Sequence, residues 1–326
     1  MNLLIGRILK LGGLRFNMNY ISNLHKILSK SIFTITAEIG PPKSSDNTII
    51  IEKGKILKDY ADAFNITDNQ TAVVRMSSLS ASKILIDNDI EPILQITCRD
   101  RNRIALQSDI LGAAALGVKN ILCLTGDHQS FGNHPESKGV FDVDSIQLIQ
   151  IVKNMRDNGI FQNGEKITSK KPALFIGAAT NPFLKCTEFT VDRLEKKINA
   201  GTNFVQTQSV FNIDKFNIWM DEIKSRGLDE MVHIIAGVSP LKSKKMANRM
   251  KFHIPGVDIP DDLYARMEKS EKPEVEGYKI SLELTNMIKK IKGVHGIHYT
   301  ALFWERIIPE LVINSKLTFK DRNIKF

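Results

Sequence analysis

The stretch EPILQITCRDRNRIALQSDILGAAALGVKNILCLTGD, residues 91–127, contains one complete unit of the fold. Two short aliphatic runs, 93–97 and 120–125, flank a segment, 101–116, in which Ile104, Leu111 and Ala115 recur on one helical face. This pattern predicts a strand, a helix and a second strand. Both predicted strands end in polar residues, T-C-R-D and T-G-D.

The same alternation continues on both sides of this unit. Further strands are predicted at 33–39, 63–67, 174–179, 204–207, 233–237 and 296–300, which makes eight in all. Further helices are predicted at 47–60, 145–158, 190–200, 214–226, 242–251, 281–291 and 303–312, and Leu148, Val152 and Met155 share one face of the second of these. Eight strands alternating with helices favour a closed (β/α)8 TIM barrel over an open sheet. Neither G-x-G-x-x-G nor G-x-x-x-x-G-K-[ST] occurs, so phosphate must be bound in another way.

The length of 326 residues suits one barrel domain, 33–326, preceded by a basic segment or short helix, 1–32. No acidic residue precedes Glu38, whereas five Lys or Arg residues do, and leaving them out lowers the net charge from +9 to +4. The first 17 residues are interpreted as a targeting segment, a short helix, or the result of a start codon assigned before the true start at Met18.

Composition excludes several classes of protein. Hydrophobic residues make up 42% and charged residues 25%, which are ordinary values for a soluble globular protein, and no apolar run is long enough to span a membrane. Three cysteines without a C-x-x-C pair favour a reducing cytoplasm over a disulfide framework. The modest positive charge suits a ligand that is an anionic small molecule. The chain has no run of Lys and Arg residues of the kind that marks a nucleic-acid-binding tail.

Two polar insertions interrupt the pattern. Residues 127–140 follow a predicted strand directly, so they are expected at the carboxyl end of the barrel, where barrel enzymes carry their chemistry. Residues 158–171 follow a predicted helix, and they are expected at the opposite, stabilising end.

Glu38 lies near the end of the first predicted strand. Strand alternation places it on the same face as Thr34 and Thr36, so it is expected to point into the barrel mouth. A partly desolvated carboxyl group there can donate a proton near neutral pH. The alternative is a structural glutamate paired with a Lys or Arg of the barrel.

Other strand ends are also polar, namely N-I-T-D-N-Q at 65–70, I-T-C-R-D at 96–100, L-T-G-D-H-Q at 124–129, Q-T-Q at 206–208 and I-H-Y-T at 297–300. Alone, Asp127 could be a turn former after Gly126. Together the strand ends predict one polar cavity. No metal site is expected, because His295 and His298 are three residues apart in a strand and therefore lie on opposite faces. Cys98 and Cys123 are interpreted as core residues.

At these strand ends the chain resembles the methylenetetrahydrofolate reductase family, flavin-dependent (β/α)8 barrels that reduce methylenetetrahydrofolate to methyltetrahydrofolate. The matching pieces are AEIGPPK at 37–43, EPILQITCRD at 91–100, GVKNILCLTGD at 117–127, AGTNFVQTQ at 200–208 and IIAGVSP at 234–240. The resemblance extends from about residue 34 to about residue 312.

The resemblance implies roles for particular residues. Glu38 stands where the family has its general acid, and Asp127 where it has the carboxylate beside the N1–C2=O region of the flavin. Gln208 matches a glutamine that contacts folate and nicotinamide. Thr67, Gln95, Thr125, Gly126 and Asp127 fall on flavin-contacting positions. The implied cofactor is FAD, with FMN as the alternative, and the implied donor is NADH or NADPH.

The chain departs from the commonest family pattern at cofactor and donor contacts. Asp68-Asn69-Gln70 replaces a Tyr-Gly-Ala turn, Gln95 replaces a frequent histidine, Thr125 replaces an arginine, and Ser209-Val210-Phe211 replaces an aromatic run. The flavin type and the electron donor therefore stay open.

Three other functions remain as alternatives. The chain could be the flavin subunit of a larger electron-transfer complex, a non-redox folate-binding methyl carrier, or a nucleic-acid-binding protein that uses its basic N-terminus. As a reductase, it is expected to act on a folate substrate, either as a homo-oligomer or with an electron-transfer partner subunit.

Overall fold

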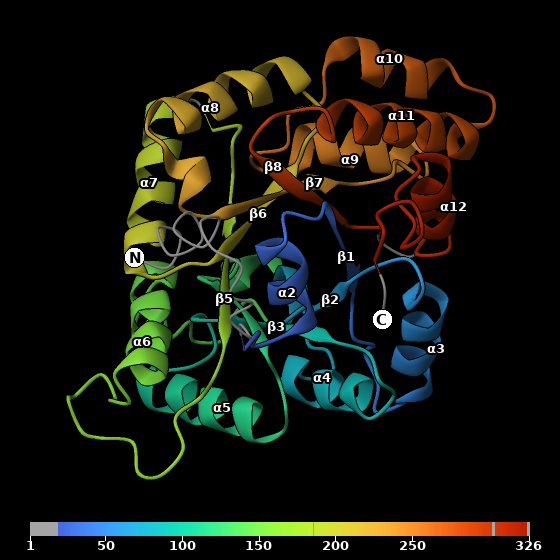
Figure 1. Ribbon diagram of the computed structural model, residues 1–326. Coiled ribbons are helices and arrows are strands. Elements are labelled where there is room, and N and C mark those ends of the chain that lie inside the picture. The colour runs from blue at the N-terminus through green and yellow to red at the C-terminus, as the bar shows by residue number, and fades with distance from the viewer. Residues whose placement is uncertain (1–18, 185, 302–303, 325–326) are drawn as a thin grey trace.

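The computed structural model describes residues 19–184, 186–301 and 304–324. In this part of the chain eight parallel strands close into one barrel, in the order in which they follow one another along the sequence (Figure 1). The predicted (β/α)8 TIM barrel is confirmed, and each predicted strand overlaps an observed one. The strands are β1 Thr34–Ile39, β2 Ala63–Ile66, β3 Pro92–Thr97, β4 Asn120–Leu124, β5 Phe175–Thr180, β6 Phe204–Ser209, β7 His233–Val238 and β8 Val294–Tyr299.

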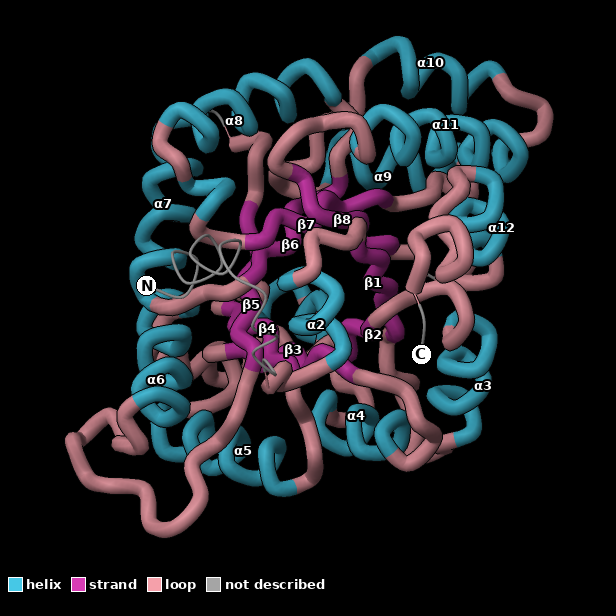
Figure 2. Tube along the Cα trace, viewed as in Figure 1, coloured by secondary structure: helices cyan, strands magenta, loops and turns pink. Residues whose placement is uncertain are grey.

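Helices form a ring around the strands (Figure 2). Two of them, α4 (Ser78–Ile86) and α10 (Asp261–Lys269), were not predicted, because a serine-rich segment and a Pro-Asp-Asp start both resemble loops. The helices are α2 Asn23–Ser29, α3 Thr48–Leu57, α4 Ser78–Ile86, α5 Arg103–Ala115, α6 Ser145–Asp157, α7 Thr187–Ala200, α8 Ile213–Ser225, α9 Lys244–His253, α10 Asp261–Lys269, α11 Pro273–Ile288 and α12 Ile307–Asn314.

The buried face of α5 differs from the predicted one. Ile104 is 74% exposed, whereas Leu106, Ile110 and Ala113 face the barrel. Asn102 accepts hydrogen bonds from the backbone N–H groups of Ile104 and Ala105, which places Ile104 in the solvent-facing first turn. For α6 the predicted face is correct, since Leu148, Val152 and Met155 are fully buried.

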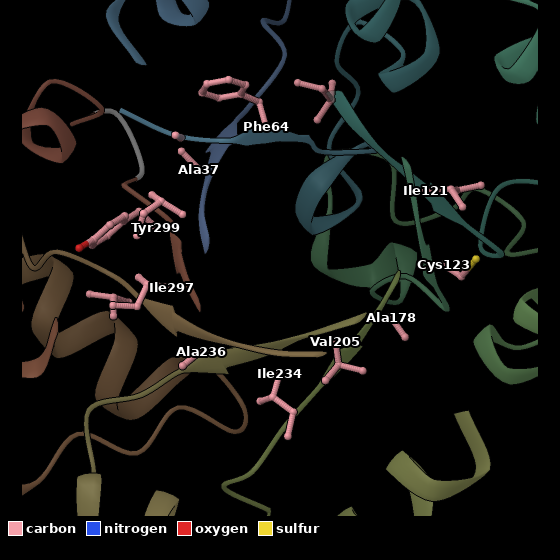
Figure 3. Close-up of a cluster of buried hydrophobic side chains, with 14 of the residues drawn as sticks. Ala37, Phe64, Ile121, Cys123, Ala178, Val205, Ile234, Ala236, Ile297 and Tyr299 are labelled. Carbon is pink, nitrogen blue, oxygen red and sulfur yellow. The ribbon is translucent and has the colours of Figure 1, made fainter. Parts of the chain in front are cut away.

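The main core lies between the strands and the ring of helices. Outward-pointing residues of the strands, such as Ala37, Ile121, Val205, Ile234 and Ile297, meet the apolar faces of the helices there (Figure 3). Cys98 and Cys123 belong to this core and are fully buried, as predicted. The alternation of the strands therefore leaves every second residue to fill the barrel interior.

Helix α2 closes the amino end of the barrel, in the centre of the ring of strands (Figure 2). Its Leu24 and Leu28 pack on an apolar floor made by Ala63, Ile93, Leu122, Phe175, Phe204 and Ile235. The carboxylate of Glu91 anchors the helix, because it accepts hydrogen bonds from the backbone N–H groups of Asn23 at 2.8 Å and Leu24 at 2.9 Å. Thus a segment before residue 33 contributes to the barrel core.

A polar layer lies above this floor, inside the barrel. The amides of Asn65 and Gln206 exchange two hydrogen bonds, at 2.6 and 2.9 Å. Thr36 Oγ1 accepts from Gln206 Nε2 at 3.1 Å and contacts His298 Nδ1 at 3.0 Å. Since Thr36 is two residues before Glu38 on the same strand face, this layer lies directly beneath the mouth.

None of the helices in the described residues has the length and apolar character needed to cross a membrane.

Candidate functional site

The carboxyl ends of β1 to β4 surround a cavity of about 260 Å³ that opens to solvent. It is lined by Glu38, Thr67, Asp68, Asn69, Gln70, Gln95, Thr97, Arg99, Leu124, Thr125, Gly126 and Asp127. The structure therefore brings Glu38, Asp127 and all of the other predicted cofactor-contacting residues to one place. Gln208 does not line this cavity.

Glu38 is a half-buried carboxyl group in the wall of the cavity. Its Oε1 accepts one hydrogen bond from Nε2 of Gln70, at 3.2 Å. Burial raises the pKa of Glu38 from 4.5 to about 7, because desolvation outweighs the opposing effects of Gln70, Lys53 and Arg75. Among the described residues no ion pair to Glu38 occurs, and Lys53 and Arg75 act on it through their charges; its role as an acid stays a prediction.

A second carboxylate contributes to this protonation. Glu305, which follows β8, repels the ionised form of Glu38 and so favours the protonated form. Glu305 itself forms an ion pair with Lys53 of α3, at 2.6 Å. The mouth thus combines two carboxyl groups and one ammonium group, which come from β1, from α3 and from the segment after β8.

Three of the predicted cofactor-contacting residues have buried or partly buried polar groups. Thr67 is 1% exposed, and its Oγ1 has no hydrogen-bond partner among the described residues. Gln95 is 8% exposed, and its main-chain carbonyl oxygen accepts a hydrogen bond from Ser78 Oγ at 2.8 Å. Thr125 Oγ1 accepts from the backbone N–H of Ser145 at 3.2 Å, which ties the end of β4 to the start of α6.

Gly126 precedes the predicted insertion 127–140 and Asp127 begins it; the insertion lies at the mouth, as expected. Gly126 has a φ of +93°, and a Cβ there would lie 3.1 Å from the Cβ atoms of both Thr97 and Arg99. Only glycine allows this turn and this close approach. Asp127 is exposed at the cavity rim, and its carboxylate makes no hydrogen bond or ion pair within the described part of the chain.

The loop after β2 has an unusual backbone. Asn69, Thr71 and Ala72 all have positive φ values, between 43° and 59°, although none is glycine. Such conformations cost on the order of 1 kcal/mol or more each and persist where the surroundings enforce them. Here the loop presents Gln70 to Glu38, at a position where the chain departs from the family pattern.

Gln208 lies on the opposite side of the barrel, in β6. Its Oε1 accepts a hydrogen bond from the backbone N–H of Ser209 at 3.1 Å, beside an irregularity in the pairing of β6 with β7. It belongs to the mouth by its position on the strand, but it does not contact the cavity that Glu38 and Asp127 share.

Sequence reasoning did not single out Arg99, Arg101 and Asp68 as a group. Asp68 is a fully buried carboxylate that pairs with Arg101 at 2.7 Å and accepts from the backbone N–H and Oγ1 of Thr97, both at 2.9 Å. The guanidinium of Arg99 is almost fully buried in the cavity wall. The sequence signal that could have identified this group is the presence of two arginines in the strand end T-C-R-D-R, residues 97–101.

A second cavity, of about 300 Å³, has the Lys53–Glu305 pair in its wall. It is lined by Ile49, Glu52, Lys53, Ile56, Lys242, Trp304, Glu305 and Arg306. These residues come from α3 and from the segments after β7 and β8, so this cavity is also at the carboxyl end of the barrel. Across the described ranges, no cluster of three or more His, Cys, Asp or Glu residues is arranged to hold a metal ion.

A polar cavity at the carboxyl ends of the strands, with a carboxyl group that titrates near neutral pH, defines a barrel of the type that supports acid–base chemistry. A model of the family described as methylenetetrahydrofolate reductase matches residues 23–316. The chain therefore belongs to the methylenetetrahydrofolate reductase family.

Individual relatives are distant. Methylenetetrahydrofolate reductase 2 of Schizosaccharomyces pombe is 26% identical over 245 residues, which cover 71% of this chain and 36% of that protein. The 5,10-methylenetetrahydrofolate reductase of Salmonella typhimurium is 23% identical over 217 residues, covering 65% of this chain and 66% of that protein. The 5,10-methylenetetrahydrofolate reductase of Pectobacterium carotovorum is 21% identical over 275 residues, which cover 82% of this chain and 85% of that protein. The chain thus spans little more than a third of the yeast relative's length.

Among solved structures, an uncharacterized protein from Clostridium thermocellum that binds two copies of 5-methyl-5,6,7,8-tetrahydrofolic acid has the same fold. The TM-score is 0.65 at 16% sequence identity, and the match covers 93% of this chain and 100% of that chain.

Proposed function

We propose that this protein reduces 5,10-methylenetetrahydrofolate to 5-methyltetrahydrofolate with a bound flavin. The observation that carries the proposal is the position of Glu38, whose pKa is about 7, in the same cavity as Asp127 in a barrel of this family. A carboxyl group with that pKa is available both as an acid and as a base at neutral pH.

The cavity residues fit the ring system of a flavin. The unpartnered, buried Oγ1 of Thr67 can exchange a hydrogen bond with a ligand, and the close packing of Gly126 on Thr97 and Arg99 holds the turn that carries Asp127 at the cavity. The volume of about 260 Å³ lies just below the range of about 300–1,000 Å³ that is usual for ligand pockets, which suits a ring system with its phosphates outside the cavity. Resemblance to the family favours FAD over FMN.

When bound, reduced flavin supplies the hydride that the methylene carbon accepts. Glu38 donates its proton to N10 of the folate as the five-membered ring opens, which makes that carbon electrophilic. Gln70 orients the carboxyl group of Glu38 through the hydrogen bond at Oε1. Asp127, at the rim, would hold the flavin at its N1–C2=O region, as the family resemblance implies.

We further propose that donor and folate use this one cavity in turn, which gives ping-pong kinetics. The donor is NADH or NADPH. Gln208 contacts the folate from β6, on the far side of the mouth. The second cavity, with Lys242 and Arg306 in its wall, offers cationic groups to an anionic substrate. A cytoplasmic location is consistent with the three free cysteines.

The absorption spectrum of the purified protein tests the proposal first, because a bound flavin absorbs in the visible range. Assays with NADH, NADPH and an artificial dye then identify the donor. Dye reduction without nicotinamide oxidation would indicate instead a flavin subunit fed by another protein.

A non-redox folate-binding protein is the second candidate, since the Clostridium thermocellum protein of the same fold binds methyltetrahydrofolate. A colourless protein that binds folate, and that takes up neither FAD nor FMN on reconstitution, would support it against the reductase.

A further inference from the structure

Arg99 is a buried cation that joins two loops of the mouth. Its side chain is 3% exposed. Nη1 donates a hydrogen bond to the carbonyl oxygen of Asp127, and Nη2 donates to the carbonyl oxygen of Asn69, both at 3.2 Å. Nε and Nη2 also bind the carboxylate of Asp100, at 2.8 and 2.7 Å. One guanidinium therefore holds the loops that follow β2 and β4.

The backbone around Arg99 holds the other end of the 127–140 insertion. The carbonyl oxygen of Arg99 accepts a hydrogen bond from the N–H of Val140 at 2.7 Å, and that of Cys98 accepts from Phe141 at 3.2 Å. The first residue of the insertion, Asp127, is therefore bound by the side chain of Arg99, and its last residue, Val140, is bound by the main chain of Arg99. Gly126 packs against the Cβ of Arg99 at the start of the same loop.

The position of Asp127 depends on this anchoring of its main chain. Within the described residues its carboxylate has no hydrogen bond or ion pair, but it lines the cavity, and its charge and that of the Arg99 guanidinium attract each other. The neighbouring Arg101 does not share this task, since it pairs with Asp68 and Asp109.

We infer that Arg99 is a positioning residue, which fixes the backbone at Asp127 so that the Asp127 carboxylate faces the cavity. A lysine keeps the charge but cannot bridge two carbonyl groups and a carboxylate with one planar group. The consequence for the flavin rests on the proposed function, whereas the anchoring of the loop does not.

The first test uses the flavin-free protein. Amide hydrogen exchange over residues 126–133 is measured in Arg99→Lys, Arg99→Met and the matched control Arg103→Met. Arg103 binds Asp142 just beyond the insertion and does not contact Asp127. Exchange should rise about tenfold or more in both Arg99 variants and stay within about twofold in the control. Wild-type exchange in a folded Arg99→Lys protein, checked by circular dichroism, would overturn the inference.

The second test measures the reduction potential of bound flavin in a double-mutant cycle of Arg99→Lys and Asp127→Asn. If Arg99 acts through Asp127, Arg99→Lys shifts the potential in the wild-type background and leaves it unchanged in the Asp127→Asn background. An undiminished shift in that background would refute the inference. Absence of flavin binding in the wild-type protein would count against the proposed function, while the exchange experiment would still decide the role of Arg99.

Discussion

Replacing Glu38 by glutamine should change how the stability of the protein depends on pH. Burial raises the pKa of Glu38 in the folded protein to about 7, whereas the ordinary value is 4.5. Between these values the unfolded chain releases the proton and the folded protein retains it. The contribution of Glu38 to the free energy of unfolding is therefore fully present below pH 4.5 and is lost as the pH rises through 7.

The size of the effect follows from the two pKa values. At about 1.4 kcal/mol per pH unit, the difference amounts to about 3–4 kcal/mol in total, of which about 2–3 kcal/mol falls between pH 5 and pH 8. This is an upper limit, because Glu38 is half-buried and solvent reaches it through the mouth. Screening by that solvent reduces the expected loss to about 1–2 kcal/mol.

Urea denaturation of the flavin-free protein at pH 5, 6, 7 and 8 measures the free energy of unfolding. As the pH rises from 5 to 8, the free energy of unfolding of Glu38→Gln should increase by about 1–2 kcal/mol relative to that of the wild type. Glu136→Gln, at an exposed position in the insertion, controls for the loss of one carboxylate. Parallel curves for wild type and Glu38→Gln would show that Glu38 is ionised throughout, and the proposed acid would have to be sought elsewhere.

Glu38→Gln should also slow the folate half-reaction by about 10²–10⁴-fold and spare the donor half-reaction, as stopped-flow kinetics would show; equal slowing of both would make Glu38 structural. Asp127→Asn removes a negative charge beside the reduced ring system, so it should raise the reduction potential in a redox titration; an unchanged potential would contradict this. A chain that starts at Met18 should keep turnover within about threefold, whereas one that starts at Phe33 should lose the thermal transition seen by circular dichroism, because it lacks the helix that closes the barrel. Arg322→Met leaves the buried carboxylate of Asp62 without its partner and should cost about 3–5 kcal/mol in urea denaturation; a loss below about 1 kcal/mol would be inconsistent with a buried pair.

The strands were predictable because each carries a local signal. Short β-branched runs mark all eight, six of them end in polar residues, and alternation within β1 placed Glu38 on the inner face. Helix α4 was missed because its serines favour turns and caps in isolation, and Ile104 was assigned to the wrong face because periodicity does not specify where a helix begins.

The candidate site was only partly accessible to sequence reasoning. Parallel strands bring their carboxyl ends together, so Thr67, Gln95 and Thr125 could be expected near Glu38, as the cavity shows. Gln208 follows the same rule but lies outside that cavity, because which strand ends share a cavity depends on the side chains between them. The anchoring role of Arg99 requires contacts with residues about 30 positions away on either side.

The sequence by itself determined the barrel and which residues stand at its mouth, because both follow from local patterns of polar and apolar residues. Tertiary structure alone decided the chemistry available to those residues. The pKa of Glu38 depends on burial and on Glu305, which is brought to the mouth from the far end of the chain. Desolvation and electrostatic interaction depend on distances in space, and no spacing along the chain specifies them.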